Sequence, residues 1–168
     1  MPPTRMALET TLIHGGEPEP RIRGAVAFPI FQSSTYLSGA AEEGDYHAIR
    51  YVRLSNSPNH EVLHRKLALL EAGEAALVTS SGMAAISTSL LTILSSGDHV
   101  LMQRGVYGGT HALALRELAD FGVAVDFIAA GDPSSWERSL RPTTRAIYVE
   151  AMTNPLLQVA DLDAVVAF

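Results

Sequence analysis

Cysteine is absent from the 168-residue sequence, and lysine occurs once, as Lys66, among 12 basic residues. The absence of cysteine excludes disulfides, thiolate nucleophiles and cysteine-based metal sites, and it fits a reducing cytoplasm. No apolar run reaches the roughly 18 residues of a membrane span, and the N-terminus lacks the apolar segment of a signal peptide. The 18 acidic residues give a formal charge of −6, which disfavours binding to duplex nucleic acid. We therefore expect a globular cytoplasmic protein with neither a membrane nor a nucleic acid as its partner.

The first 58 residues differ in composition from the rest of the chain. They contain six of the nine prolines and the pair Gly15-Gly16, which predicts an extended arm with little regular structure. The stretch 25–36 carries aromatic and β-branched residues that favour burial, so we expect the arm to pack on another surface. We therefore assign residues 1–58 to an N-terminal arm.

From residue 59 onward the sequence alternates between helical and strand patterns. Asn59 is a candidate N-cap and Gly73 a stop signal for the first helix. The pattern predicts helices over 59–72, 82–95, 110–121 and 133–140, strands over 75–79, 99–102, 123–128 and 145–149, and a last helix from Asp161. This alternation predicts an α/β fold with a parallel sheet covered on both faces. The last helix has barely two turns before Phe168, so we expect residues 59–168 to be the first part of a larger domain in a longer protein.

Ligands of such sheets bind beyond the carboxyl ends of the strands, and two of the loops there have suggestive composition. Ser81, Gly82 and Met83 form a strand-to-helix turn, where free N–H groups and the helix dipole favour a phosphate. Tyr107 precedes two glycines and could stack on a flat ring. Each turn, taken alone, is also compatible with an ordinary loop.

Two further segments present polar groups that could meet a ligand. Asn154 precedes a proline, which favours an extended backbone and lets its amide point at a ligand oxygen. Tyr51 and Arg53 are two residues apart in a stretch that we expect to be extended, so both side chains would face the same way and suit an anionic group.

A zinc-peptidase motif is present in its short form, His60-Glu61-Val62-Leu63-His64. A helix places His60 and His64 on one face, but the sequence offers no third ligand at the usual spacing. A solvated helix face accounts for the same residues, and we expect no metal site.

Taken together, these segments resemble the Cys/Met-metabolism family of pyridoxal-phosphate enzymes, which includes cystathionine γ-synthase, cystathionine β-lyase, cystathionine γ-lyase and methionine γ-lyase. The resemblance runs from about Thr11 to the last residue. It is carried, in the family's order and approximate spacing, by YVRLSNSPN, KLALLEAGEAALVTSSGMAAI, GDHVL, YGGT, FGVAVDF and YVExxxNPLL. It implies an aspartate-aminotransferase-like large domain, here incomplete, behind an extended N-terminal arm that is exchanged within a homodimer or homotetramer.

The resemblance also implies roles for particular residues toward pyridoxal 5′-phosphate. Tyr51 and Arg53 would bind the cofactor phosphate of the neighbouring subunit, and the turn of Ser81, Gly82 and Met83 would bind the phosphate in the same subunit. Tyr107 would stack on the pyridine ring and assist proton transfer. Asn154 would reach the ring hydroxyl oxygen, and Glu150 would lie close by.

The sequence departs from the family pattern in two ways. The family's stretch E-T-P-x-N-P is Glu150-Ala151-Met152-Thr153-Asn154-Pro155 here. The lysine that forms the Schiff base with the cofactor has no counterpart, because Lys66 matches a family position that is not catalytic. We expect a sulfur-amino-acid lyase or synthase whose N-terminal part, by itself, is inactive. The alternative is a truncated, non-catalytic paralogue that pairs with a full-length subunit.

Overall fold

The computed structural model describes residues 7–37, 49–129 and 131–168. Contacts divide the chain into two compact units, one that ends at Val78 and one that spans Thr79–Phe168. No helix among the described residues is long and apolar enough to cross a membrane.

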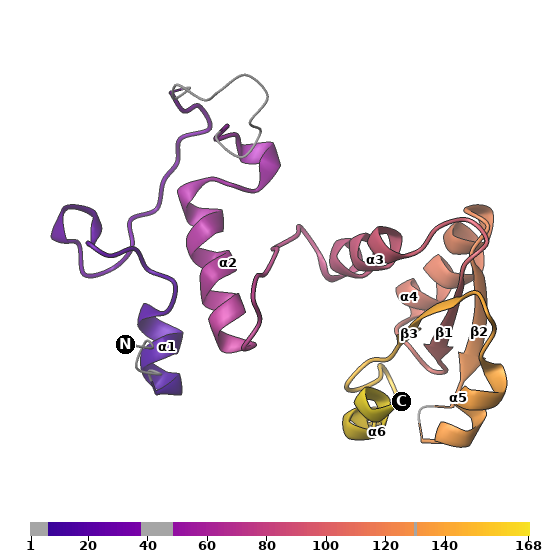
Figure 1. Ribbon diagram of the computed structural model, residues 1–168. Helices are drawn as coiled ribbons and strands as arrows, with labels where there is room; N and C mark the ends of the chain where they lie inside the picture. The colour runs from indigo at the N-terminus through magenta and orange to yellow at the C-terminus, as the bar shows by residue number, and fades with distance from the viewer. Residues whose placement is uncertain (1–6, 38–48, 130) are drawn as a thin grey trace. The chain divides into compact units, whose positions relative to one another are not determined.

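The first unit is built on two helices, α1 (Leu8–His14) and α2 (Pro58–Leu70), with short 3-10 turns at η1 (Ile22–Gly24) and η3 (Val52–Leu54). Helix α1 packs against α2 (Figure 1). At Gly16 the chain comes so close to α2 that an added Cβ would lie 2.6 Å from the backbone N of Lys66. The Lys66 ammonium donates hydrogen bonds to the carbonyl oxygens of Leu12 and Ile13, at 3.2 and 2.9 Å. It thereby satisfies carbonyls that the end of α1 leaves without partners.

Asn59 does not cap α2, contrary to the prediction from the sequence. The helix begins one residue earlier, at Pro58, and the Ser57 side chain is its N-cap. Asn59 instead bridges the backbone of Phe31, accepting from its N–H at 3.0 Å and donating to its carbonyl at 2.7 Å. The segment 55–59 contains several residues that can cap a helix. Asn59 is not the cap because its side chain binds the backbone of Phe31, which is distant in the sequence.

The arm also differs from its predicted character. It contains the regular helix α1, and the segment 25–36 is largely exposed within this unit: Val26 is 76% and Ile30 83% exposed. The packing of this segment on another surface therefore stays a prediction.

The second unit confirms the parallel α/β prediction. Its elements in order are α3 (Gly82–Ile93), β1 (His99–Gln103), α4 (Gly108–Leu113), the π-helical segment η4 (Ala114–Leu118), β2 (Ala124–Ile128), α5 (Pro133–Ser139), β3 (Thr144–Tyr148) and α6 (Leu162–Ala167). The sheet has the order β2-β1-β3, and both pairings are parallel. The predicted strand 75–79 is absent from this sheet, because the described residues offer it no neighbouring strand with which to form a ladder.

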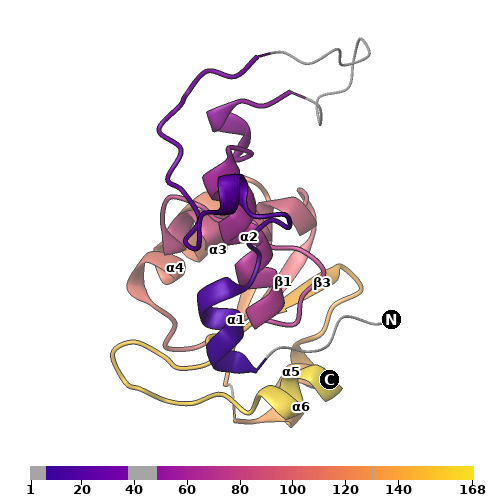
Figure 2. The same ribbon diagram turned by 90° about the vertical axis from the view of Figure 1, so that its left-hand side faces the viewer.

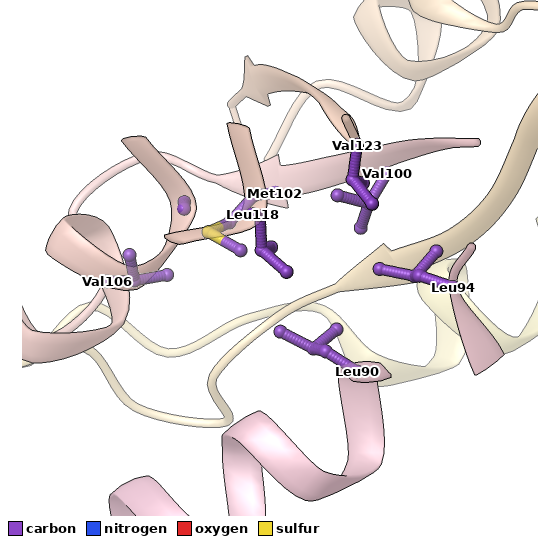
Figure 3. Packing of buried hydrophobic residues seen from close by; sticks show 8 residues of the cluster. Leu90, Leu94, Val100, Met102, Val106, Leu118 and Val123 are labelled. Carbon is purple, nitrogen blue, oxygen red and sulfur yellow. The ribbon is translucent and has the colours of Figure 1, made fainter. Parts of the chain in front are cut away.

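Helices cover both faces of this sheet. On one face, residues of α3, β1 and the α4–η4 helix form the larger core, including Leu90, Leu94, Val100, Met102 and Leu118 (Figure 3). On the other face, Leu101 and Ile128 pack against Trp136 of α5. Helices α5 and α6 lie side by side (Figure 1 and Figure 2), and the Trp136 ring is 5.4 Å from that of Phe168. Because β1 is central and buried on both faces, its carboxyl end is held firmly in place.

Candidate functional site

The start of α3 and the start of α4 meet at Gly109. A Cβ added to this glycine would lie 2.7 Å from Cε1 of Tyr107 and 3.0 Å from the sulfur of Met83. The Tyr107 ring and the Met83 thioether therefore occupy the space that any larger residue at 109 would need. Two of the predicted site segments, the turn before α3 and the tyrosine before α4, are thus brought together by the fold.

The N-terminus of α3 has the features of an anion-binding helix end. Ser81 is the N-cap, and its hydroxyl accepts from the N–H of Ala84 at 3.0 Å. The N–H groups of Gly82 and Met83 have no acceptor within the helix, and no acidic residue stands in the first turn. A Cβ at Gly82 would meet no atom within 4 Å, so the space beside this turn is open to a ligand.

Glu150, at the carboxyl end of β3, is bound to the backbone of Tyr107. Both oxygens of its carboxylate lie 3.1 Å from the Tyr107 N–H, which donates to them. The N–H of Glu150 in turn donates to the side-chain oxygen of Gln103 at 2.9 Å. Glu150 was expected near the site from the family resemblance, whereas Gln103 was not predicted, although a glutamine that ends an apolar strand was a visible signal.

Tyr148 is the last residue of β3, two residues before Glu150, and it adds a second phenol near the site. Burial raises the pKa of Tyr148 above its ordinary value, and the neighbouring Glu150 carboxylate raises it further, while a hydrogen bond with Thr110 opposes these effects. The phenol therefore stays neutral at physiological pH and can donate a hydrogen bond.

Asn154 lies on an exposed turn in the loop after β3. A bridge between Met152 and Val159 closes this loop, and buried Thr153 accepts from the N–H of Gln158 at 3.0 Å. Among the described residues, no hydrogen bond joins the Asn154 side chain to the other predicted site residues. Its predicted role toward a ligand stays a prediction.

Tyr51 and Arg53 belong to the first unit. Their stretch is a 3-10 turn, not the extended segment that was predicted, because the chain turns through η3 and Ser55 adopts a left-handed conformation with φ of 53°. The two side chains still meet: the Arg53 guanidinium carbon lies 5.9 Å from the centre of the Tyr51 ring. The Asn56 side chain accepts from the N–H of Tyr51 at 2.8 Å and holds the turn closed.

The side chains of the short zinc-peptidase motif, residues 60–64 on α2, interact with neighbouring side chains. His60 Nδ1 lies 2.7 Å from the Ser57 hydroxyl, and Glu61 forms an ion pair with Arg50 at 2.9 Å. Burial, and secondarily the nearby His60, lowers the pKa of His64. The part of the chain that the structure describes holds no group of three or more His, Asp or Glu side chains arranged for a metal ion.

The family model of the Cys/Met metabolism PLP-dependent enzymes matches residues 9–168. L-Methionine gamma-lyase of Fusobacterium nucleatum subsp. polymorphum is 40% identical over 166 residues, which cover 95% of this chain and 42% of the relative. Cystathionine gamma-lyase of Bacillus subtilis strain 168 is also 40% identical, over 94% of this chain and 40% of that protein.

Solved structures give the same picture. The crystal structure of cystathionine gamma-lyase from Lactobacillus plantarum, complexed with L-serine, has a TM-score of 0.85 and 36% identity. The match covers 96% of this chain and 41% of that one. The chain thus spans about two fifths of the length of the curated relatives that it matches.

Proposed function

The chain belongs to the Cys/Met metabolism PLP-dependent enzyme family, and on that premise we propose that it forms the N-terminal part of a lyase or synthase of sulfur amino acids. The substrate would be a cysteine- or homoserine-derived amino acid, and the reaction an elimination or replacement at its β or γ carbon. The names of the relatives, γ-lyases of methionine and of cystathionine, support this class of reaction.

The observation that carries the proposal is the meeting of Tyr107 and Met83 over Gly109 beside the start of α3. The chemistry of these groups fits pyridoxal 5′-phosphate. The N–H groups of Gly82 and Met83 suit its phosphate, since a helix N-terminus favours an anion, and the Tyr107 ring suits its aromatic face. When bound, this cofactor supplies an electron sink for the α carbon of an amino acid.

The remaining residues of this unit would orient the reacting groups. The phenol of Tyr107, 47% exposed, would take or give a proton at the substrate. Asn154 would donate from its amide to the ring hydroxyl oxygen. Glu150 would act on the backbone of Tyr107 and hold the tyrosine in register with α3.

Tyr51 and Arg53 would complete the site of a neighbouring copy. A guanidinium held over an aromatic ring keeps its donors free for phosphate oxygens, and both side chains are exposed in the first unit. We propose that the protein works in the cytoplasm as a homodimer or homotetramer in which the arm carries these two residues to the partner.

Lys66 would not carry the cofactor, because its ammonium is engaged with the carbonyls at the end of α1. We therefore propose that the 168-residue chain alone is inactive. Borohydride reduction in the presence of pyridoxal phosphate, followed by peptide mapping, should give no stoichiometric adduct at Lys66. A stoichiometric adduct with a shifted visible band would contradict this.

A second candidate function is that of a non-catalytic subunit that pairs with a full-length copy. The exposed apolar residues of segment 25–36 favour it, because such a segment gains stability from a partner surface. Mixing the chain with a full-length relative and measuring co-elution tests this candidate; separate elution at micromolar concentration would contradict it.

The leading proposal is tested with a pair of adjacent glycines. Gly109→Ala should weaken pyridoxal phosphate binding by roughly tenfold, because overpacking costs on the order of 1–3 kcal/mol and the new methyl group would displace the Tyr107 ring. Gly108→Ala is the matched control, since a Cβ there meets no atom within 4 Å. Isothermal titration calorimetry measures both affinities, with pyridoxal and inorganic phosphate as partial ligands. Absence of saturable binding by the unsubstituted chain, or equal affinity in both variants, would contradict the proposal.

A further inference from the structure

Gln103 is a polar residue in an otherwise apolar position. It ends the central strand β1, all of whose residues are buried, and its own exposed fraction is 1%. An amide in such a place is costly unless its oxygen and N–H groups find partners. Its oxygen accepts from the N–H of Glu150, 2.9 Å away at the end of β3. The side chain therefore ties together the carboxyl ends of two parallel strands.

The Glu150 that Gln103 contacts binds in turn the start of helix α4. Tyr107 is the N-cap residue of α4 and makes no capping bond through its own side chain. The Glu150 carboxylate, from the end of a different strand, accepts instead from the N–H of the N-cap residue itself, with both oxygens 3.1 Å from the Tyr107 nitrogen. A carboxylate at a helix N-terminus is favoured by the helix dipole and by the charge-assisted hydrogen bond.

From this chain of contacts we propose that Gln103 is a positioning residue for Tyr107. It fixes the backbone of Glu150, the Glu150 carboxylate fixes the Tyr107 N–H, and the Tyr107 ring is thereby held beside Met83 and Gly109. The inference rests on the proposed function in one respect, namely that the Tyr107 ring faces the cofactor. The hydrogen bonds themselves do not depend on it.

Two neighbours make this arrangement stiff. Thr110, which is fully buried, places its hydroxyl 4.0 Å from the sulfur of Met83. The partly buried phenol of Tyr148 lies near both Thr110 and Glu150. Movement of Glu150 would therefore disturb the starts of α3 and α4 together, which are the two elements that form the candidate site.

The test compares Gln103→Met with Gln158→Met. Methionine is close to glutamine in shape but offers no amide oxygen, and Gln158 is exposed on the loop after β3. Hydrogen exchange followed by NMR should show protection of the Tyr107 amide falling about tenfold in Gln103→Met, the scale of one charge-assisted hydrogen bond. The Leu101 and Phe127 amides, in the sheet, should keep their protection, and Gln158→Met should leave Tyr107 unchanged. Unchanged exchange at Tyr107 in a folded Gln103→Met variant would overturn the proposal.

A measurement on the unsubstituted chain tests the proposal even if the Gln103→Met variant does not fold. In the full chain, a scalar coupling across the hydrogen bond should join the Glu150 amide nitrogen to the side-chain carbonyl carbon of Gln103. Its absence would overturn the proposal directly. Titration with pyridoxal phosphate then separates the proposed function from the positioning role of Gln103. If the unsubstituted chain fails to bind pyridoxal phosphate, the proposed function is contradicted, but the exchange result still tests the role of Gln103. If it binds, Gln103→Met should weaken the affinity and Gln158→Met should not.

Discussion

The interactions that stabilise each of the two units differ in kind. In the unit Thr79–Phe168, two apolar clusters pack on the faces of a hydrogen-bonded sheet. In the unit that ends at Val78, the buried apolar residues among those described are Val62 and Ala68, and long-range polar contacts link its parts. The second unit is therefore stabilised mainly by burial, whereas the first depends on individual hydrogen bonds and ion pairs.

The polar links of the first unit form two groups. At the start of the arm, the Glu17 carboxylate accepts from His14 at 3.1 Å and from Arg21 at 3.0 Å. The hydrogen bond from His14, followed by the positive charge of Arg21, lowers the pKa of Glu17 against an opposing effect of burial. Further along, Asn59 holds the backbone of Phe31. Each of these links is worth little by itself, so we expect this unit to gain stability from a partner surface.

The largest expected effect is a cavity in the core of the second unit. Leu118→Ala should lower the free energy of unfolding of this unit by about 2–5 kcal/mol, since Leu118 is fully buried among α3 and β1 residues. Urea denaturation followed by Trp136 fluorescence measures it, because Trp136 is the one tryptophan of the chain. Leu115→Ala, three residues earlier and 54% exposed, is the control. Similar losses in the two variants would contradict a burial-stabilised unit.

The next effect concerns Arg53 in the first unit. Arg53→Ala should weaken cofactor binding by about 1.5–3 kcal/mol, the scale of a charged hydrogen bond, and only at concentrations where copies of the chain associate. Arg65→Ala, an exposed arginine on α2, is the control. Calorimetric titrations at several protein concentrations measure the effect. A loss of affinity that is independent of concentration would show that Arg53 acts within its own chain.

Association itself should depend on the first unit. We expect the chain to self-associate, and the double substitution Val26→Ser with Ile30→Ser should weaken association by at least roughly tenfold, given 1.5–3 kcal/mol for burying one large apolar side chain. Leu156→Ser with Val159→Ser is the control in the second unit, where both residues are exposed. Size-exclusion chromatography with light scattering measures the oligomeric state. A compact monomer before any substitution would contradict the expectation.

The smallest effect is a pH dependence inside the second unit. Burial, followed by the charge of Arg141, lowers the pKa of His99, and the nearby Asp126 only partly opposes this. The folded unit therefore holds His99 neutral, and the unfolded chain binds its proton more readily. Its contribution to stability is complete above an unfolded pKa of about 6.5 and is lost as the pH falls through that value toward the lower folded pKa.

Urea denaturation of the second unit at pH 7.5 and 5 measures this dependence. His99→Gln should flatten it, because the amide can still reach the Thr144 hydroxyl, 2.7 Å from His99 Nδ1, without titrating. The His99 Nε2 atom is 3.2 Å from Asp126 but has no hydrogen-bond partner of suitable geometry among the described residues. His111→Gln, on α4, is the control, and a slope that it removes equally would contradict the assignment to His99.

The second unit was largely predictable from the sequence, and the first was not. The apolar pattern correctly predicted the strands at 99–102 and 123–128, because the local pattern and the burial of the side chains agree there. It failed for 75–79, where a strand pattern lacks a described partner. The helix predicted over 110–121 is present, and its middle passes into the π-helical segment Ala114–Leu118. In the first unit Asn59 has a non-local role, which no local rule could assign.

The same distinction applies to the candidate site. The turn at Ser81, Gly82 and Met83 could be recognised from its small residues before a helix, and the aromatic at Tyr107 from its position after the strand β1. The role of Gln103 could not be predicted in this way, because it depends on the register that brings β1 beside β3. A single sequence can indicate which loops meet a ligand, but the hydrogen bonds that hold them come from the pairing of distant strands.

The single lysine has a consequence for the kinetics of the arm. Lys66 can react with an amine-specific reagent only when its nitrogen leaves the carbonyls of Leu12 and Ile13. Where this contact re-forms faster than the reagent reacts, the modification rate is proportional to the fraction of time for which the Lys66 nitrogen is free of both carbonyls. No other side chain in the sequence carries a primary amine, so side-chain labelling by such a reagent measures the opening of this one contact, and a partner that holds α1 against α2 would slow the labelling.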